Sequence, residues 1–119
     1  MTTNKTPAQL ARDNARKMLA KGITVASIAQ AQLLIEKWNA LIGVPKSHMS
    51  DNGFSVCLYM PKGETWIRHA VPVGSGKIKD FIKNASTWMT SQPDAVAKIR
   101  AEALVAHAAG AEAVDGSWN

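Results

Sequence analysis

The spacing of apolar residues changes from helical to strand-like part-way along the chain, and this change restricts the fold more than any other feature. Over residues 24–42, apolar side chains recur every three or four positions, which is the period of an α-helix. From Phe54 to Met60 they alternate with other residues, as in a half-buried β-strand. Both periods occur within 119 residues, which is a typical domain length, so we expect an α+β protein.

Four helices and one β-hairpin are predicted, in the order ααββαα. Thr6, Pro7 and Gln9 have the spacing of a capping box with proline in the first turn, which predicts a helix ending near Gly22. The second helix is predicted to end at Gly43. The remaining predicted elements are a loop over 46–53, antiparallel strands over 54–60 and 65–73, and helices over 77–90 and 91–109.

The composition favours a single domain over residues 1–119. Apolar residues make up 46% and charged residues 19%, which suits a chain with one buried core. Residues 110–119 form a tail that contains Trp118, and an exposed aromatic residue in a tail is typical of an interface segment. The last helix is rich in alanine from Ala101 onward, so a homo-oligomer that pairs through this helix and the tail is one expectation.

A reducing cytoplasm is the expected location. Cys57 is the only cysteine, which excludes an internal disulfide framework. Residues 1–9 are polar and are not followed by the apolar segment of a secretory signal. The apolar stretch over 25–42 is interrupted by Glu36, Lys37 and several other polar residues, so we expect no membrane span.

Residues with catalytic or metal-binding chemistry are few and scattered. His48, His69 and His107 fall in a predicted loop, strand and helix, without the spacing of a shared metal site. Cys57 has no base partner close in sequence, although pairing with His69 across the hairpin would be one arrangement. The carboxylates form no acid–base pair. We expect no enzymatic activity, no metal and no cofactor.

The positive charge is concentrated in two segments. The formal net charge is +5, and residues 1–50 carry seven Lys or Arg against two acidic residues. A second group lies between Lys62 and Lys83, with five basic residues against Glu64 and Asp80. Such segments favour an acidic partner, for example nucleic acid or a nucleotide, and are also common as solubilising surface charge.

A glycine-rich connection between the second strand and the third helix is suited to binding anions. Gly74, Ser75 and Gly76 precede Lys77, and backbone N–H groups at a helix N-terminus attract phosphate. The segment is not a nucleotide-hydrolysing P-loop, because Val71 and Ile78 stand where that motif needs glycine and Ser or Thr. A tight turn without ligand is the other interpretation.

The first functional hypothesis is a non-catalytic basic binding domain that contacts phosphates of nucleic acid or a nucleotide. Trp66 would lie at the interface beside Arg68, where it could stack on a base. The predicted phosphate-binding residues are Arg12, Arg16, Lys17, Arg68, Gly74, Ser75, Gly76, Lys77, Lys79 and Lys83, and the predicted interface residues are Trp66 and Trp118.

Two other hypotheses are compatible with the same sequence. One is a stoichiometric protein inhibitor or adaptor of phage or plasmid origin, of the counter-defence type that includes anti-CRISPR proteins, acting by binding a host protein complex. It rests on the small size, the basic charge and the lack of a catalytic motif. The other is a structural homo-oligomer in which the hairpin is completed across the subunit interface.

Overall fold

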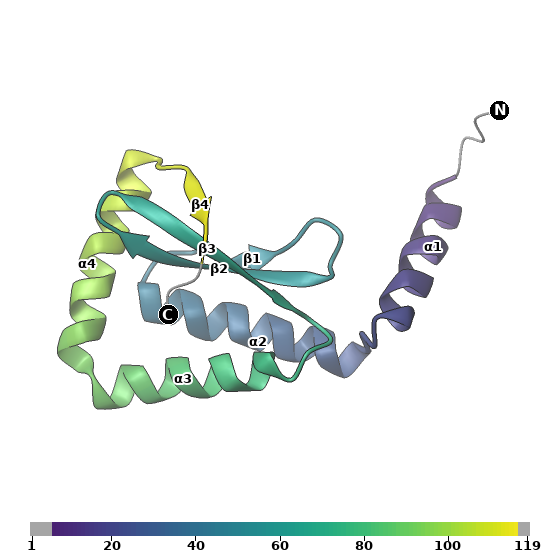
Figure 1. Ribbon diagram of the computed structural model, residues 1–119, viewed down its shortest axis with the longest axis horizontal. Helices are drawn as coiled ribbons and strands as arrows, with labels where there is room; N and C mark the ends of the chain where they lie inside the picture. The colour runs from purple at the N-terminus through teal and green to yellow at the C-terminus, as the bar shows by residue number, and fades with distance from the viewer. Residues whose placement is uncertain (1–5, 117–119) are drawn as a thin grey trace.

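The structure, a computed structural model, describes residues 6–116 and has an α+β fold (Figure 1). In this part of the chain four helices accompany a four-stranded mixed sheet, which confirms the predicted class. The elements are α1 (Pro7–Ala20), α2 (Val25–Ile42), β1 (His48–Met49), β2 (Ser55–Lys62), β3 (Thr65–Pro72), α3 (Lys77–Ser91), α4 (Pro93–Ala109) and β4 (Ala113–Asp115).

The ends of the first two helices follow from local side-chain chemistry. The Thr6 hydroxyl accepts a hydrogen bond from the N–H of Gln9, and the Gln9 side chain accepts one from the N–H of Thr6, so the predicted capping box is present. Thr24 caps α2 in the same way. Gly43 ends α2 with a φ of 83°, a left-handed conformation that favours glycine.

The sheet has two long central strands and two short edge strands. β2 and β3 form the predicted antiparallel hairpin, in register from Ser55–Pro72 to Lys62–Thr65. β1 pairs with β2 antiparallel, and β4 returns from the C-terminal side to pair with β3 in parallel. The predicted loop over 46–53 and the predicted tail over 110–119 therefore each contain a strand. Strands of two or three residues are too short to leave a periodic pattern in the sequence.

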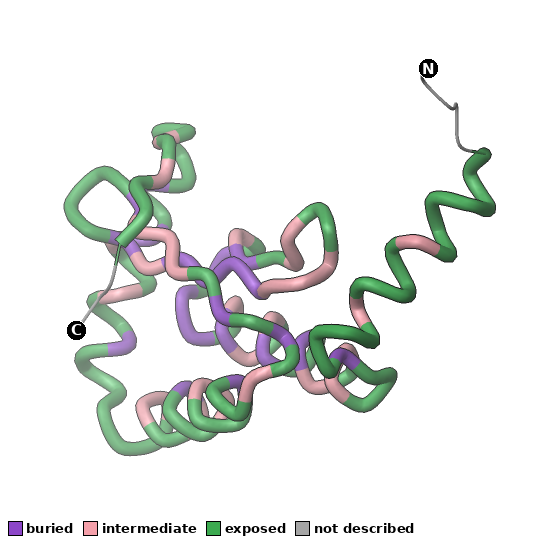
Figure 2. Tube along the Cα trace, turned by 45° about the vertical axis from the view of Figure 1, so that its right-hand side comes forward, coloured by how far each residue is buried: buried purple, intermediate pink, exposed green. Residues whose placement is uncertain are grey.

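The prediction that the first strand is half-buried is wrong, because both faces of β2 are covered. Four consecutive residues, Val56 to Tyr59, are buried. Helices α2, α3 and α4 pack on one face of the sheet (Figure 1). On the other face the ammonium group of Lys46 lies 4.9 Å from the centre of the Tyr59 ring. Figure 2 shows the buried residues gathered in the central strands and α2.

Aromatic rings join the helices beneath the sheet. Trp38 of α2 is fully buried and packs edge-on against Phe81 and Trp88 of α3, with ring-centre distances of 5.8 and 5.9 Å. His69 of β3 lies 5.8 Å from the Phe81 ring on the same side. Trp38 is thus a core residue, and Trp88 is partly buried against it.

Helix α1 extends away from the rest of the molecule (Figures 1 and 2). It contains no buried residue, and its apolar side is left uncovered, with Leu10 54% and Leu19 70% exposed. Met18 is the α1 residue that packs, half-buried, against the core. Within residues 6–116, no single helix is long and apolar enough to cross a membrane, and α1 with α2 meets that test only as a pair bent by 87°.

Candidate phosphate-binding site

The connection between β3 and α3 packs directly against the turn between α1 and α2. A Cβ atom added at Gly74 would lie 2.5 Å from the carbonyl oxygen of Lys21 and 3.6 Å from the carbonyl carbon of Gly22. Glycine is therefore required at position 74 by close backbone approach. This contact brings the start of α3 next to the end of α1, although the two segments are about fifty residues apart in the sequence.

A hollow of about 320 Å³ lies where these two segments meet. Lys21 contributes its charge, and its ammonium group lies 5.1 Å from the centre of the Phe54 ring. Ser55 and Ser75 add polar groups to the wall. The lining residues are Lys21, Ile23, Phe54, Ser55, Pro72, Gly74 and Ser75. The hollow therefore combines one cation with hydrogen-bonding groups and a small apolar floor.

The N-terminus of α3 opens beside this hollow without a side-chain cap. Gly76 occupies the N-cap position, and no side chain accepts a hydrogen bond from the first turn, in contrast to α1 and α2. The N–H groups of a first helical turn have no partner within the helix and carry partial positive charge. Asp80, in the first turn, offsets part of this charge.

Ser75 shapes the loop through its own hydrogen bonds. Its hydroxyl and its backbone N–H both donate to the carbonyl oxygen of Pro72, at 2.9 and 3.2 Å. These contacts form the tight turn that leads from β3 into α3. The donors of Ser75 are thus used within the chain.

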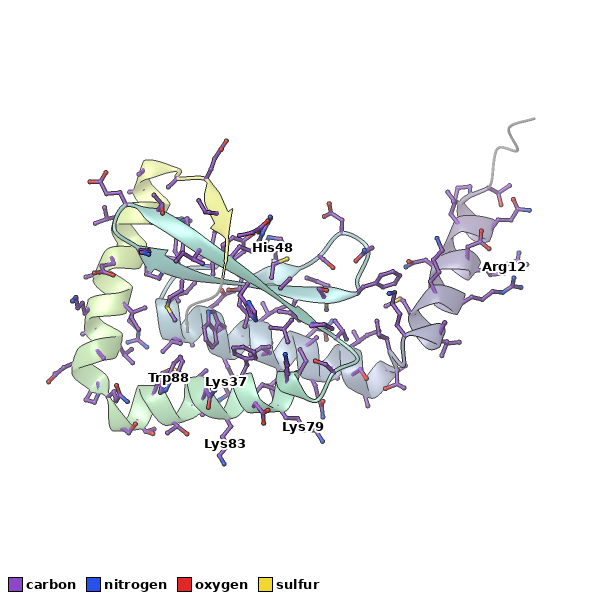
Figure 3. The ribbon with its side chains drawn as sticks, in the orientation of Figure 1. Arg12, Lys37, His48, Lys79, Lys83 and Trp88 are labelled. Carbon is purple, nitrogen blue, oxygen red and sulfur yellow. The ribbon has the colours of Figure 1, made fainter. Side chains whose placement is uncertain are left out.

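Most of the predicted cations are exposed on α1, which ends at this corner, and on α3, which starts there. Lys79 and Lys83 lie one turn apart on α3 and point away from the body of the molecule, while Arg12 points outward from α1 (Figure 3). Lys77 is exposed at the start of α3. The exposed cations of α1 are Arg12, Arg16 and Lys17.

Arg68 is held apart from this group. It lies on β3 opposite Asp115 of β4, and its Nε is 2.6 Å from the Asp115 carboxylate. The pKa of Arg68 is raised because its guanidinium hydrogen-bonds to Asp115 and to the Tyr59 hydroxyl. The pKa of Asp115 is lowered by the same ion pair. The charge of Arg68 is therefore partly balanced within the sheet, on the face opposite the helices.

Of the two predicted interface tryptophans, the structure describes Trp66. Trp66 is only 1% exposed, with Tyr59 packed edge-on at 6.3 Å and the Lys46 ammonium group 5.9 Å away. Its ring is covered within the chain and offers no surface on which a base could stack. Trp118 lies outside the described residues.

The chain has been compared with protein-family models, with curated proteins and with solved structures, and nothing matched. Function is therefore inferred from this chain's own residues.

Cys57 and His69 are engaged in packing, and His48 is engaged in hydrogen bonds. Cys57 and His69 point to opposite faces of the hairpin, because Cys57 pairs with Ala70 and Leu58 pairs with His69. Burial raises the pKa of the Cys57 thiol, and the positive charge of Arg68 opposes this effect in part. Among residues 6–116 no group of three or more His, Cys, Asp or Glu side chains is placed to hold a metal ion.

His48 forms a hydrogen-bonded pair with Tyr59 on the outer face of the sheet. Its Nδ1 lies 2.9 Å from the carbonyl oxygen of Met49, so this nitrogen donates, and its Nε2 accepts from the Tyr59 hydroxyl at 3.1 Å. The pair connects β1 to β2.

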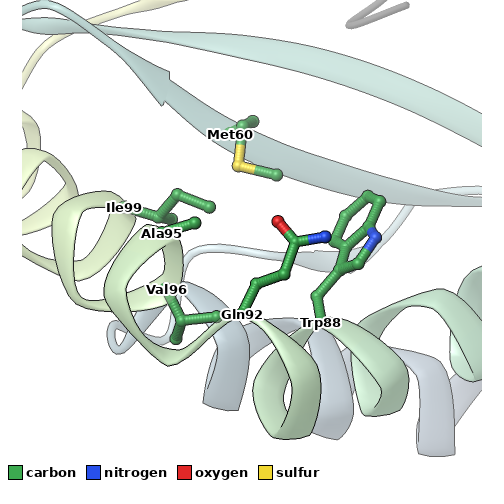
Figure 4. A pocket seen from close by; sticks show the side chains of 6 residues that line it. All are labelled: Met60, Trp88, Gln92, Ala95, Val96 and Ile99. Carbon is green, nitrogen blue, oxygen red and sulfur yellow. The ribbon is translucent and has the colours of Figure 1, made fainter.

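A second hollow lies between β2 and the corner formed by α3 and α4 (Figure 4). Its only polar side chain is the Gln92 amide, and its other lining residues are Met60, Trp88, Ala95, Val96 and Ile99. Without a charged group, this hollow is poorly suited to phosphate.

Sequence reasoning did not place Phe54 in the site, and it gave no reason to place Lys21 beside the glycine-rich connection. Lys21 lies at the end of α1 and Phe54 lies just before β2, and only the contact between Gly74 and Lys21 brings them beside Ser75. The only signal in the sequence was a glycine in each of the two connections, Gly22 and Gly74, and glycines in connections are common. The contact partner of a glycine cannot be read from its position in the sequence.

Proposed function

We propose that this protein is a non-catalytic binding domain that contacts the phosphate groups of nucleic acid or of a nucleotide. The observation that carries the proposal is the close approach of Gly74 to the Lys21 carbonyl group. That approach puts a lysine, an uncapped helix N-terminus and a hollow next to one another. Each of the first two attracts a phosphate oxygen, and both adjoin the hollow.

A phosphate at the mouth of the hollow would contact the Lys21 ammonium group and the N–H groups that begin α3, with Lys77 beside it. Neighbouring phosphates would be neutralised along α1 by Arg12 and Arg16, and along α3 by Lys79. These contacts go to the backbone of a nucleic acid and not to its bases, so we expect binding with little sequence preference. The affinity should fall steeply with salt, because bound counterions are released.

The test is a titration of labelled single-stranded and double-stranded oligonucleotides and of a free nucleotide, followed by fluorescence anisotropy between about 50 and 200 mM salt. Replacing Lys77 and Lys79 together by alanine should lower the slope of log affinity against log salt by roughly two. Replacing Lys62 by alanine is the control, because Lys62 is an exposed cation at the end of β2, away from the hollow.

Two results would count against the proposal. One is the absence of binding at low salt for every ligand tested. The other is a loss of affinity in Lys62→Ala at least half as large as that in the double variant of Lys77 and Lys79, since this would reduce the effect to general surface charge.

The inhibitor or adaptor hypothesis remains a second candidate because of one feature, the uncovered apolar surface around the corner between α1 and α2. A shallow apolar hollow lies there, and Leu19 and Val25 beside it are strongly exposed. An amphipathic helix with an uncovered apolar side is typical of helices that bind a groove on another protein. If the protein binds no phosphate ligand, a host protein retained by the wild type and lost by Leu19→Glu would support this function.

A further inference from the structure

Helix α4 is apolar on two opposite sides. Its inner side, with Val96, Ala103 and Ala106, is buried against α2, α3 and the sheet. Its outer side should be polar if it faced water alone. Yet Leu104 and Val105 there are 60% and 51% exposed, and the alanines Ala97, Ala101 and Ala108 are exposed beside them, with Asp94 and Lys98 as charged residues of the same side. Figure 2 shows α4 largely exposed along this side.

The outer residues have the spacing of a helix-packing surface. Ala97, Ala101 and Val105 form a row with a spacing of four, and Leu104 lies beside this row. Alanines at the centre of such a row let two helix axes approach closely, and Leu104 would then fill the space above a partner's alanine. Arg100 is drawn to the side, since its Nη2 donates to the Ala40 carbonyl oxygen at 2.9 Å.

The charges beside this row identify the partner that fits it. Lys98 and Glu102 lie four residues apart along one edge of the outer side, and neither is fully buried. In an antiparallel pair of α4 helices whose two-fold axis passes beside Ala101, between it and Arg100, Lys98 of one copy lies beside Glu102 of the other. In a parallel pair the two-fold axis runs along the helices, so the edge that carries Lys98 and Glu102 faces the opposite edge of the partner helix and these charges do not meet.

We propose that the protein forms a homodimer by antiparallel packing of α4 against α4 of a second copy. In this arrangement Ala101 lies beside the two-fold axis, and Leu104 packs against Ala97 of the other copy. Two contacts between Lys98 and Glu102 flank the pair. The inference is independent of phosphate binding, because the residues of the hollow lie on other elements.

The first experiment measures the mass of the full chain in solution across a range of concentrations by sedimentation velocity. The wild type should be a dimer, and Leu104→Glu should raise the dissociation constant more than tenfold by placing a charge at the packed centre. The matched control is Leu19→Glu, which places the same charge on an exposed leucine of α1 and should leave the dimer intact. A monomeric wild type, or equal disruption by both variants, would overturn the proposal.

The second experiment tests the orientation. Lys98→Glu and Glu102→Lys should each weaken the dimer about fivefold, because each places like charges together at two positions. The double variant Lys98→Glu with Glu102→Lys should restore the wild-type dissociation constant. Circular dichroism at equal concentration would show that the helix content is unchanged. A double variant as weak as the single ones would exclude the antiparallel register.

Discussion

The indole Nε1 of Trp38 donates a hydrogen bond of 2.9 Å to the backbone carbonyl oxygen of Tyr59. This side chain from α2 binds a backbone group that a neighbouring strand would otherwise bind. β1 pairs only with Val56 and Cys57, so the outward backbone groups of Tyr59 have no strand partner. The N–H of Tyr59 donates instead to the Ser47 hydroxyl at 3.2 Å. Beyond the end of β1, two side chains thus bind the N–H and the carbonyl group of Tyr59. Leaving these buried backbone groups without hydrogen bonds would cost free energy of folding.

Substitution of Ser47 by alanine should destabilise the protein. Ser47 is buried, and without its hydroxyl the N–H of Tyr59 would have no partner, at a cost of about 1–3 kcal/mol. Asn39 holds Ser47 in place through two hydrogen bonds to its backbone, so the loop should keep its position. The free energy of unfolding in urea measures the effect. Ser86→Ala on α3 is the control, and equal stability of the two variants would contradict the assignment.

Substitution of Gly74 by alanine should move the start of α3 away from the end of α1, which together form the candidate site. The new Cβ would meet the Lys21 carbonyl oxygen at 2.5 Å, and a displacement of this backbone should cost about 1–3 kcal/mol. Phosphate binding should weaken with it. Gly76→Ala is a matched control two residues away, because a Cβ there meets nothing within 4 Å and its φ is −67°. If the two variants have the same free energy of unfolding and the same affinity for phosphate ligands, the Gly74 contact does not organise the site.

Local chemistry explains which parts of the fold were predictable. Thr6 and Gly43 act on neighbouring residues, and the helix ends that they predict are present. The edge strands β1 and β4 depend on pairing with distant residues and leave no periodic pattern. The same distinction holds in the candidate site. The exposed lysines of α3 were predictable from helical spacing, whereas the contact of Gly74 with Lys21 and the pairing of Arg68 with Asp115 depend on tertiary packing.

The ion pair between Arg68 and Asp115 should make the attachment of β4 sensitive to acid. The pKa of Asp115 is lowered by its hydrogen bond with Arg68, so the pair stabilises the folded form above the ordinary carboxyl pKa of about 3.9. This contribution is lost as the pH falls from there through the lowered pKa. The amide resonance of Gly116, whose N–H donates to the Arg68 carbonyl oxygen, should report the change.

Asp115→Asn is the control for this titration. It should remove the acid transition at Gly116, since the amide does not titrate. Both side chains are exposed, so the global unfolding transition should change little. If the acid transition at Gly116 persists in the variant, it arises from another carboxylate.

The thiol of Cys57 should react slowly in the folded protein. It is buried, and burial raises its pKa, so little thiolate is present at neutral pH. Modification by a disulfide reagent should be much slower than in urea, and its rate should continue to rise at alkaline pH. A folded-state rate equal to that in urea would show that β2 opens readily at this position.

Helix α1 should be the least protected helix in hydrogen exchange. It has 14 residues and buries none of them, and a helix of this length is marginal in water without tertiary packing. In α2, by contrast, Leu34 and Trp38 are fully buried. Exchange measured by mass spectrometry should be fast across α1 and slow across the middle of α2. Leu10→Ala should change the free energy of unfolding by less than about 0.5 kcal/mol, whereas Leu34→Ala should cost about 2–5 kcal/mol.

The same measurement connects α1 to function. If α1 contacts phosphates, an oligonucleotide should slow exchange in α1 at low salt, because binding stabilises the ordered helix. A protein that binds the oligonucleotide and leaves α1 exchange unchanged would restrict the phosphate contacts to the hollow and α3. Strong protection of α1 without any ligand would instead indicate that a second copy covers it, a contact that the α4 dimer does not supply.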